Sequence, residues 1–588
     1  MAVTTRPTRP TSDNGGAAGR GTSGETEDRA HAPVDGVALD MLLTEAATGP
    51  AQRWVPGRAV LNAAFNLARR PRLVARRGTG LAADLARITA GRSELAPAKG
   101  DRRFKDPAWV GNPAFRRLGQ AYLAAAAAID QLVDDAELDW AQERRLRFAA
   151  SNLMDAVAPT NFPLTNPAVL KAVLDTGGKN FARGLEHFLA DMSRPPRIPS
   201  MVNGDSFEVG ENLAVTPGAV IFRTEVFELI QYEPQTATVR ERPLLVVPPM
   251  INKYYVTDLA PGRSMIEHAV QHGQQVFAIS WRNPDKRHAG WNLDTYVRAV
   301  VEALDAVQEI AGCEQAHALG LCAGGIVLAT AAAHLAARTP SEERLAGLTL
   351  AVCVLDNARA GTTSAFLDRR AASMAIADSA RRGYLDGRAL AGVFAWLRPN
   401  DLIWNYWVNN YLVGNDPPAF DVLYWNADTT NLPAALHRDF VELSLENSLV
   451  HPGRLKALGT PVDLSKLTLD TYLVAGITDH ITPWENCYRS TQLLGSSPRF
   501  VLSTSGHIAA MVNPPSNERA SYHCNDHNPP APEEWMHTAR REKGTWWLDW
   551  SRWLAERSGE EKPAPVQLGT TGLPPLDPAP GTYVLAKQ

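Results

Sequence analysis

The stretch Ala316–Arg338, AHALGLCAGGIVLATAAAHLAAR, decides the fold of this chain. Its first five residues predict a buried strand, and its last thirteen predict a helix. The residues between them follow the pattern G-x-C-x-G, in which Cys322 occupies a sharp strand-to-helix turn. Glycine is needed two positions before and after such a turn, because a Cβ there would collide with neighbouring backbone. The positive end of the helix dipole favours the thiolate form of Cys322, although a buried cysteine without a chemical role remains the alternative.

Short apolar runs on both sides of this turn predict a mostly parallel sheet. Helical segments at Ser264–His272 and Leu293–Ile310 separate several of these runs, which is typical of a sheet with both faces covered. The predicted strands are Phe227–Tyr232, Pro243–Val247, Gln275–Trp281, Ala316–Gly320, Thr349–Leu355, Thr471–Ala475 and Arg499–Ser503. We therefore predict the α/β class, with an α/β-hydrolase fold that carries an inserted cap and follows an all-helical N-terminal domain.

Composition divides the chain into four parts. Residues 1–36 contain few large apolar side chains and predict a disordered segment. Residues 37–205 predict the helical domain, with helices at Phe115–Leu132, at Trp140–Val157 and between Asn166-Pro167 and Gly177-Gly178. Residues 206–558 predict the catalytic domain, in which a Trp-rich insertion at about 356–460 forms the cap, and residues 559–588 predict a Pro-rich, irregular tail.

Two further residues stand where partners of Cys322 are expected. Asp479 follows the predicted strand Thr471–Ala475, and His507 follows Arg499–Ser503. In the predicted fold the order along the chain is nucleophile, acid and histidine, each after a later strand. A turn-forming aspartate and a structural histidine are the alternatives when each residue is taken alone.

The roles follow from this order. His507 would take the proton of the Cys322 thiol, and Asp479 would orient the imidazole and stabilise its charged form. The backbone N–H groups of Ala323 and of Ile251, in the loop after Pro243–Val247, would stabilise the oxyanion.

Composition and charge exclude several classes of protein. The chain has 59 Lys and Arg against 63 Asp and Glu, a net charge of −4, which argues against a dedicated nucleic-acid binder. Its five cysteines form no CxxC pair and predict a reducing, cytoplasmic compartment. The first residues lack the apolar core of a secretory signal, and the most apolar stretches are too short to span a bilayer. No nucleotide-binding motif is present, His523, Cys524 and His527 lack a second pair of ligands at zinc spacing, and we expect no cofactor or metal.

A cysteine in this turn favours acyl transfer. A thiolate that attacks a thioester exchanges one thioester for another, so the acyl group stays activated, whereas a serine would hold it as an oxygen ester of lower free energy. Transfer of the acyl group to an alcohol is the reaction for which this property is useful.

Several stretches resemble the poly(3-hydroxyalkanoate) synthases, bacterial enzymes that polymerise (R)-3-hydroxyacyl-CoA into polyester. The similarity covers roughly residues 100–555 and departs from the family at Leu321 and Ala323, which are expected to line the site. The stretches are RFKDPAW (103–109), NGDSFEVGENLAVTPGAVIFR (203–223), ELIQY (228–232), RPLLVVPPMINKYYVTDL (242–259), SWRNPD (280–285), GLCAGG (320–325), NYWVNNYL (405–412), DHITPW (479–484) and GHIAAMVNPP (506–515).

The resemblance implies a Cys-Asp-His triad at Cys322, Asp479 and His507 and a single-subunit enzyme of class I or class II, with RFKDPAW similar to the medium-chain class II branch. It also implies release of coenzyme A, a growing polyester chain as the second ligand, a homodimer that contacts through the cap, and a place on the surface of polyester granules.

Two rival functions remain open at this stage. One is a Cys-dependent hydrolase, either a thioesterase or a polyester depolymerase, and the other is a non-catalytic granule-associated protein. Among residues outside the triad, His480 lines the substrate path or supports it from behind, and Cys313, Cys353 and Cys487 are interpreted as small core residues. The basic cluster Arg69, Arg70, Arg72, Arg76 and Arg77 is interpreted as a solvated helix face, with an anionic surface or CoA phosphates as the alternative ligand.

Overall fold

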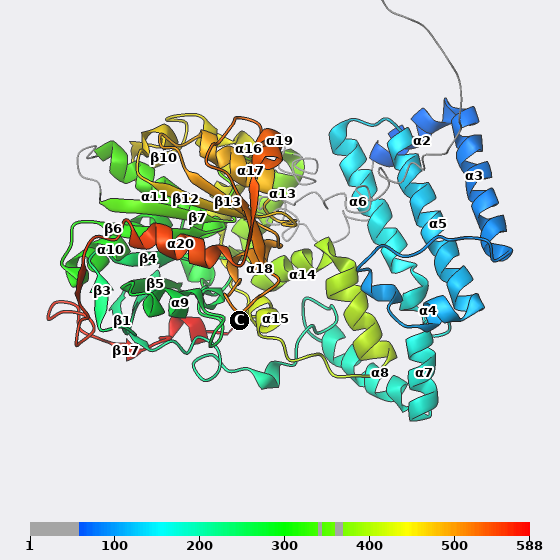
Figure 1. Cartoon of the computed structure of the whole chain (residues 1–588), viewed down its shortest axis with the longest axis horizontal. Helices are drawn as coiled ribbons and strands as arrows, with labels where there is room; N and C mark the ends of the chain where they lie inside the picture. The colour runs from blue at the N-terminus through cyan, green and yellow to red at the C-terminus, as the bar shows by residue number, and fades with distance from the viewer. Residues whose placement is uncertain (1–57, 339–343, 359–368, 588) are drawn as a thin grey trace, which may run out of the picture. The chain divides into compact units, whose positions relative to one another are not determined.

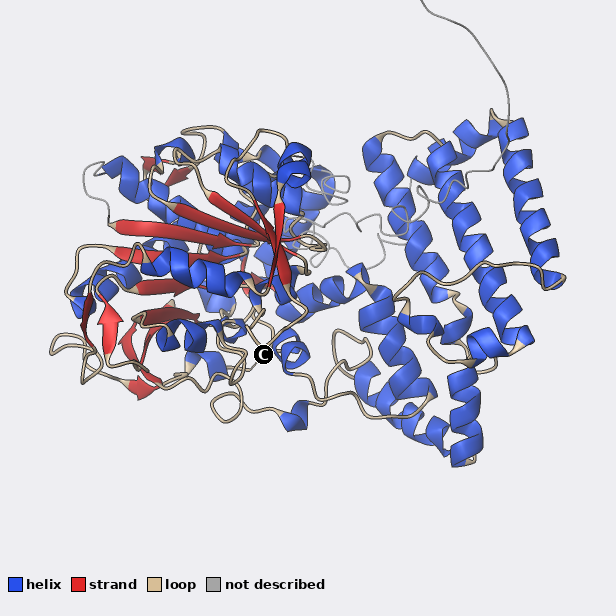
Figure 2. Ribbon diagram, in the orientation of Figure 1, coloured by secondary structure: helices blue, strands red, loops and turns tan. Residues whose placement is uncertain are grey.

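The sheet that the sequence predicts around Ala316–Arg338 is the centre of the structure, a computed structural model that describes residues 58–338, 344–358 and 369–587. Six neighbouring strands run parallel (Figure 2). In spatial order they are β5 (Val276–Trp281), β4 (Leu244–Val247), β6 (Ala316–Leu321), β7 (Leu345–Ala351), β12 (Thr471–Gly476) and β13 (Arg499–Ser503).

Antiparallel strands extend this block on both sides to a total of eleven, and of these five added strands the sequence predicted only Phe227–Tyr232. Beyond β5 lie β2 (Phe227–Tyr232), β1 (Gly218–Arg223) and β17 (Asp577–Pro578), and beyond β13 lie β14 (Ser521–Cys524) and β15 (Arg540–Lys543). β15 is exposed and polar along its whole length, so its sequence lacks the apolar run that signals a central strand.

One predicted strand is displaced along the chain. Thr349–Leu355 was expected, but β7 ends at Ala351, where Val352 adopts a left-handed backbone with φ +47°. Val352 to Leu355 are buried all the same, so their apolar character reflects a buried loop and not a strand.

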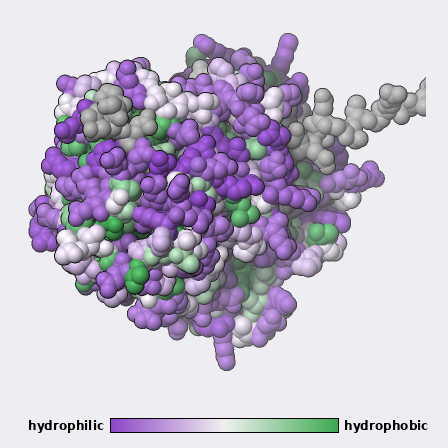
Figure 3. All heavy atoms as spheres, turned by 60° about the vertical axis from the view of Figure 1, so that its left-hand side comes forward, coloured by the Kyte–Doolittle hydropathy of each residue, from purple (hydrophilic) through white to green (hydrophobic). Residues whose placement is uncertain are grey.

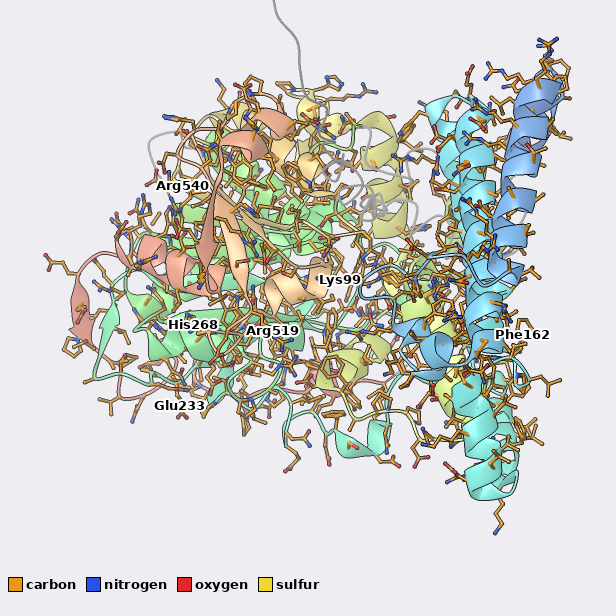
Figure 4. All side chains as sticks on the ribbon, turned by 45° about the vertical axis from the view of Figure 1, so that its right-hand side comes forward. Lys99, Phe162, Glu233, His268, Arg519 and Arg540 are labelled. Atoms are coloured by element: carbon orange, nitrogen blue, oxygen red, sulfur yellow. The ribbon has the colours of Figure 1, made fainter. Side chains whose placement is uncertain are left out.

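Successive strand residues face two separate cores, as the pleat of a strand requires. Leu245 and Val247 of β4 face a core with α10 (Leu293–Ala311) and α11 (Ala323–Arg338). Leu244 and Val246 face the other core, with α9 (Met265–Gln271) and α20 (Trp546–Ala555), which is drawn red along the sheet in Figure 1. His268 of α9, labelled in Figure 4, bonds to Ser551 of α20 at 3.0 Å and joins these two helices.

Residues 58–205 contain helices and no strand. The Asn166-Pro167 cap begins α7, and Gly177 with φ +60° ends it, as the sequence predicts. The α-helices are α2 (Arg58–Ala68), α3 (Pro71–Thr89), α4 (Ala108–Gly111), α5 (Pro113–Asp135), α6 (Trp140–Ala156), α7 (Pro167–Thr176) and α8 (Lys179–Met192). The predicted disordered segment 1–36 lies outside the described residues.

The long connection between neighbouring strands β7 and β12 contains the predicted cap. Its elements are α13 (Arg369–Arg382), β8 (Tyr384–Leu385), α14 (Gly387–Leu397), the π-helical η7 (Asn400–Trp404) and η8 (Trp407–Leu412), α15 (Asp421–Ala427), β9 (Leu432–Pro433), α16 (Ala434–Glu446), η9 (Ser448–Val450), β10 (Lys456–Ala457) and β11 (Thr460–Pro461). α8 packs against η8, where Asn180 donates to the Leu412 carbonyl at 2.7 Å. The NYWVNNYL stretch therefore joins the cap to the helical domain.

The segment after α20 has neither helix nor strand over residues 564–576, as an irregular tail would, but it also contains two short paired strands. β16 (Glu561–Pro563) pairs with β3 (Thr238–Arg240), and β17 pairs with β1 at the edge of the main sheet. The sequence of this segment does not predict β16 and β17, because their partner strands β3 and β1 lie far away along the chain. The remaining short helices are α17 (Trp484–Arg489), α18 (His507–Met511) and α19 (Pro532–Thr538).

No helix in the described ranges is long and apolar enough to cross a bilayer. The face in Figure 3 is mostly hydrophilic, with small separate hydrophobic patches.

The turn after β6 explains its glycines. A Cβ on Gly320 would lie 2.6 Å from the Gly325 Cα, and a Cβ on Gly324 would lie 2.4 Å from the Pro248 carbonyl oxygen. Both contacts are shorter than atoms allow, and both neighbours are backbone that cannot swing away. The glycines thus let α11 approach β4 and β6 closely enough to hold Cys322 between them.

We predict that Gly324→Ala destabilises the protein, because the added methyl group must push α11 away from the loop after β4. The expected loss in the free energy of unfolding is about 1–3 kcal/mol, the usual effect of overpacking, measured by urea denaturation. Gly290→Ala is the matched control, since its Cβ would meet nothing within 4 Å. Equal stability of the two variants would contradict this interpretation of the turn.

Candidate active site

Cys322 occupies the turn between β6 and α11 in a strained conformation. Its φ is +49°, in the left-handed region that residues with a side chain seldom adopt. The Cys322 N–H donates to the Ala351 carbonyl at 2.9 Å, and the Cys322 carbonyl accepts from the Gly325 N–H at 2.9 Å. These two hydrogen bonds stabilise the strained backbone conformation of Cys322. Strained backbone of this kind is concentrated at functional sites.

Asp479 and His507 lie at the ends of the neighbouring strands β12 and β13, and they contact each other. His507 Nδ1 and Asp479 Oδ2 are 2.7 Å apart, and both side chains are buried. Cys322 lines the same cavity as His507 and is one of the groups that raise the pKa of its ring. The structure therefore brings Cys322 close to the hydrogen-bonded pair His507 and Asp479.

Thr482 belongs to the same network, although the sequence analysis did not select it. Its hydroxyl donates to Asp479 Oδ2 at 2.6 Å and lies 3.2 Å from His507 Nδ1. The backbone N–H groups of Ile481 and Thr482 donate to Asp479 Oδ1 at 2.8 and 2.9 Å. A Thr three residues after an Asp is a turn signal that could have indicated this arrangement.

Charge within the triad reinforces these contacts. Burial acts to raise the pKa of Asp479, but the charge of His507 and the hydrogen bonds from His507 and Thr482 lower it overall. Burial acts to lower the pKa of His507, but Asp479 and Cys322 raise it to about 10. The imidazole is therefore well suited to hold a proton taken from a neighbouring thiol.

A cavity of about 350 Å³ opens above the triad. Cys322 and His507 line it from the sheet side, and cap residues cover it from the other side. The apolar cap residues on its wall are Phe394, Leu402, Phe420, Val422, Leu423 and Trp425. The cavity lies at the carboxyl ends of the parallel strands, where ligands bind in open α/β sheets.

Two arginines lie on the wall of this cavity among its apolar and polar side chains. Arg263 pairs with Asp421 at 2.5 Å, and Arg398 pairs with Asp401. Neither arginine was selected from the sequence, because no motif surrounds them and only the folded cap brings Arg398 to the cavity. Each of these arginines is thus paired with a carboxylate at the wall of the cavity.

Ala323 and Ile251, whose backbone N–H groups are predicted to stabilise the oxyanion, lie on two different elements. Ile251 lines the cavity together with Cys322, and Ala323 is the first residue of α11, buried directly after Cys322. Leu321 and Ala323 were expected to line the site, but their side chains belong to the two cores and are absent from the cavity wall that the described residues form. Leu321 ends β6 and Ala323 begins α11, and both side chains are fully buried there.

The remaining candidates divide into two groups. His480 lines the cavity, and burial lowers its pKa to about 4. Cys353 and Cys487 are fully buried next to the triad, where burial raises the pKa of each thiol. In the basic cluster, Arg70 pairs with Glu137 and Arg77 pairs with Asp135. Carboxylates of the helical domain therefore neutralise part of the positive charge of the cluster.

Comparison with known proteins identifies the family and the fold of this chain. Residues 100–269 match the family model described as the poly-beta-hydroxybutyrate polymerase (PhaC) N-terminus, and residues 253–514 match the alpha/beta hydrolase fold. Poly(3-hydroxyalkanoate) polymerase 2 of Ectopseudomonas oleovorans is 46% identical over 507 residues, which cover 86% of this chain and 90% of that protein. The poly(3-hydroxyalkanoate) polymerase subunit PhaC of Cupriavidus necator is 42% identical over 85% of each chain.

Among solved structures, a hydrolase from Pseudomonas aeruginosa aligns over 50% of this chain and 92% of its own, with 18% identity and a TM-score of 0.30. The assignment of the fold rests on the strand order and the family model. With two relatives above 40% identity over most of its length, this chain belongs to the poly(3-hydroxyalkanoate) polymerase family and is an acyltransferase on an α/β-hydrolase fold.

Proposed function

We propose that this chain polymerises (R)-3-hydroxyacyl units from coenzyme A thioesters, with Cys322 as the residue that carries the acyl group. The observation that supports this proposal best is the hydrogen-bonded pair His507 and Asp479, with Cys322 and His507 on the wall of one cavity. Its relatives are named as polymerases of the same polyester. The chemistry needs no cofactor beyond the thioester substrate.

The first half of the reaction loads the enzyme. His507 takes the proton of the Cys322 thiol, and the thiolate attacks the carbonyl carbon of the acyl-CoA thioester. The N–H groups of Ala323 and Ile251 stabilise the negative charge that develops on the carbonyl oxygen. The bond from carbon to the CoA sulfur breaks, and the leaving thiolate takes the proton from His507.

The second half transfers the acyl group. The 3-hydroxyl of an incoming or growing unit gives its proton to His507, and its oxygen attacks the thioester on Cys322. The C–S bond breaks and the proton returns to the Cys322 sulfur. Because the new oxygen ester has lower free energy than the thioester, elongation proceeds.

The wall of the cavity suits these substrates. Apolar cap residues accommodate an acyl chain and exclude the water that would hydrolyse the thioester. Arg263 and Arg398 are cations that attract the phosphates of coenzyme A. We extend the proposal to a homodimer that contacts through the cap and to a location at the surface of cytoplasmic granules, for which the support is membership of the family.

We predict that Cys322→Ala abolishes both CoA release and polymer formation from (R)-3-hydroxybutyryl-CoA and a longer homologue. Loss of the nucleophile is expected to lower CoA release by roughly 10³-fold or more, measured with a thiol reagent alongside polymer recovery. Cys313→Ala is the control, because Cys313 lies outside the cavity wall. Full activity of Cys322→Ala would contradict the mechanism.

The wild-type products separate the rival functions in the same assay. Free 3-hydroxy acid in amounts equal to the released CoA, without polymer, would identify a hydrolase. A wild-type protein that releases no CoA from any acyl length would support a non-catalytic granule protein.

We predict that Asp479→Asn shifts the alkylation of Cys322 to higher pH. Asp479 raises the pKa of His507, so its charge helps the imidazole to hold a proton. Without that charge the pKa of His507 falls, and the imidazole takes the thiol proton less readily. Iodoacetamide labelling, quantified by mass spectrometry across pH, should show a slower rate at pH 7 that recovers at alkaline pH. An unchanged pH profile would exclude this role of Asp479.

A further inference from the structure

The loop after β4 carries a buried lysine directly beyond the residues that line the cavity. Pro249, Ile251 and Asn252 belong to the cavity wall, and Lys253 follows them with 4% of its side chain exposed. A buried ammonium group is unfavourable unless each of its three N–H donors finds an acceptor.

All three donors of Lys253 are satisfied, and the acceptors come from two distant segments. Nζ lies 2.9 Å from Asp428 Oδ1, directly after α15 of the cap. It also donates to the carbonyl oxygens of Val584 at 2.6 Å and Ala586 at 2.9 Å. Figure 1 marks this end of the chain beside α15, as these contacts require.

The cap holds the same loop through further hydrogen bonds. Trp425 Nε1 donates to the Lys253 carbonyl at 2.7 Å, and the Thr430 hydroxyl donates to the Met250 carbonyl at 2.8 Å. A single β-bridge pairs Asn252 with Thr429. The backbone and the side chain of the loop are thus bonded to one segment of the cap.

The segment that supplies the two carbonyls is itself anchored to the sheet. Glu228 of β2 is fully buried and accepts from the N–H groups of Thr582 and Tyr583 at 3.0 and 2.9 Å. The Tyr583 hydroxyl donates to the Thr224 carbonyl at 2.7 Å. Buried charges of opposite sign, Glu228 and Lys253, therefore hold residues 582–586 from two sides.

We propose that Lys253 is a positioning residue that fixes the loop Pro248–Asn252 relative to Cys322, by tying it to the cap and to residues 582–586. Lys253 does not touch the reacting atoms. It acts through Ile251, whose N–H is the second oxyanion donor of the proposed function, on which this inference rests. Residues 582–586 are then part of the support of the active site, and not an appendage.

The test compares two reactions of the same sulfur. Release of CoA from (R)-3-hydroxybutyryl-CoA passes through an oxyanion, whereas alkylation of Cys322 by iodoacetamide displaces iodide from a CH₂ group and needs no oxyanion donor. A displaced loop should slow the first reaction and spare the second. A general loss of structure would change both.

For Lys253→Met we expect CoA release to fall by about 10- to 100-fold while alkylation changes by less than about threefold, since loss of one oxyanion donor has effects of this order or larger. The KM for the thioester should change little. Lys562→Met is the matched control, because Lys562 also donates to a backbone carbonyl, that of Ala311 at 2.7 Å, but lies away from the cavity wall.

Two milder variants keep the inference testable if Lys253→Met fails to fold. Asp428→Asn keeps an oxygen acceptor and removes the charge, and deletion of residues 582–588 removes the two carbonyls. Both should lower the ratio of CoA release to alkylation by at least about threefold. An unchanged ratio in the folded variants would overturn the role of Lys253. If wild-type protein releases no CoA, the proposed function fails first, and the two failures are distinguishable.

Discussion

The close approach of glycine backbones around Cys322 is the constraint on which the rest of the structure depends. Gly320, Gly324 and Gly325 leave no room for a Cβ between β6, α11 and the loop after β4. Only this approach lets Cys322 keep a φ of +49° with its sulfur at the floor of the cavity. The strand order β6, β7, β12 and β13 then brings the ends of β12 and β13, with Asp479 and His507, to the same edge of the sheet.

The second feature is the burial of charge beneath the cavity. A carboxylate as buried as Asp479 is unfavourable unless it is hydrogen-bonded and paired. Here two backbone N–H groups, the Thr482 hydroxyl and the His507 ring provide those bonds. Of these contacts, the one with His507 also raises the pKa of the imidazole, so the partner of the buried carboxylate is prepared to accept a proton. In this site, stability and reactivity come from the same interactions.

The cap and residues 582–586 complete the site from outside the sheet. The cap supplies the apolar wall, and it is bonded to the loop after β4 through Trp425, Asp428 and Thr430. On its other side the cap packs against α8 of the helical domain. A movement of the cap is therefore coupled through hydrogen bonds to the loop that faces the sulfur, which connects access to the cavity with the geometry of catalysis.

The sequence by itself determined the turn at Cys322, the parallel centre of the sheet and the caps of α7, and it suggested Asp479 and His507 as the partners proposed for Cys322. These features are local, because glycine spacing, apolar runs and capping residues depend on near neighbours along the chain. It did not reveal Thr482, the arginines of the cavity, the antiparallel edges or the anchoring of residues 582–586. Only the tertiary structure decided these, since Lys253, Asp428 and Val584 have no pattern in sequence and acquire their partners when segments more than 150 residues apart meet.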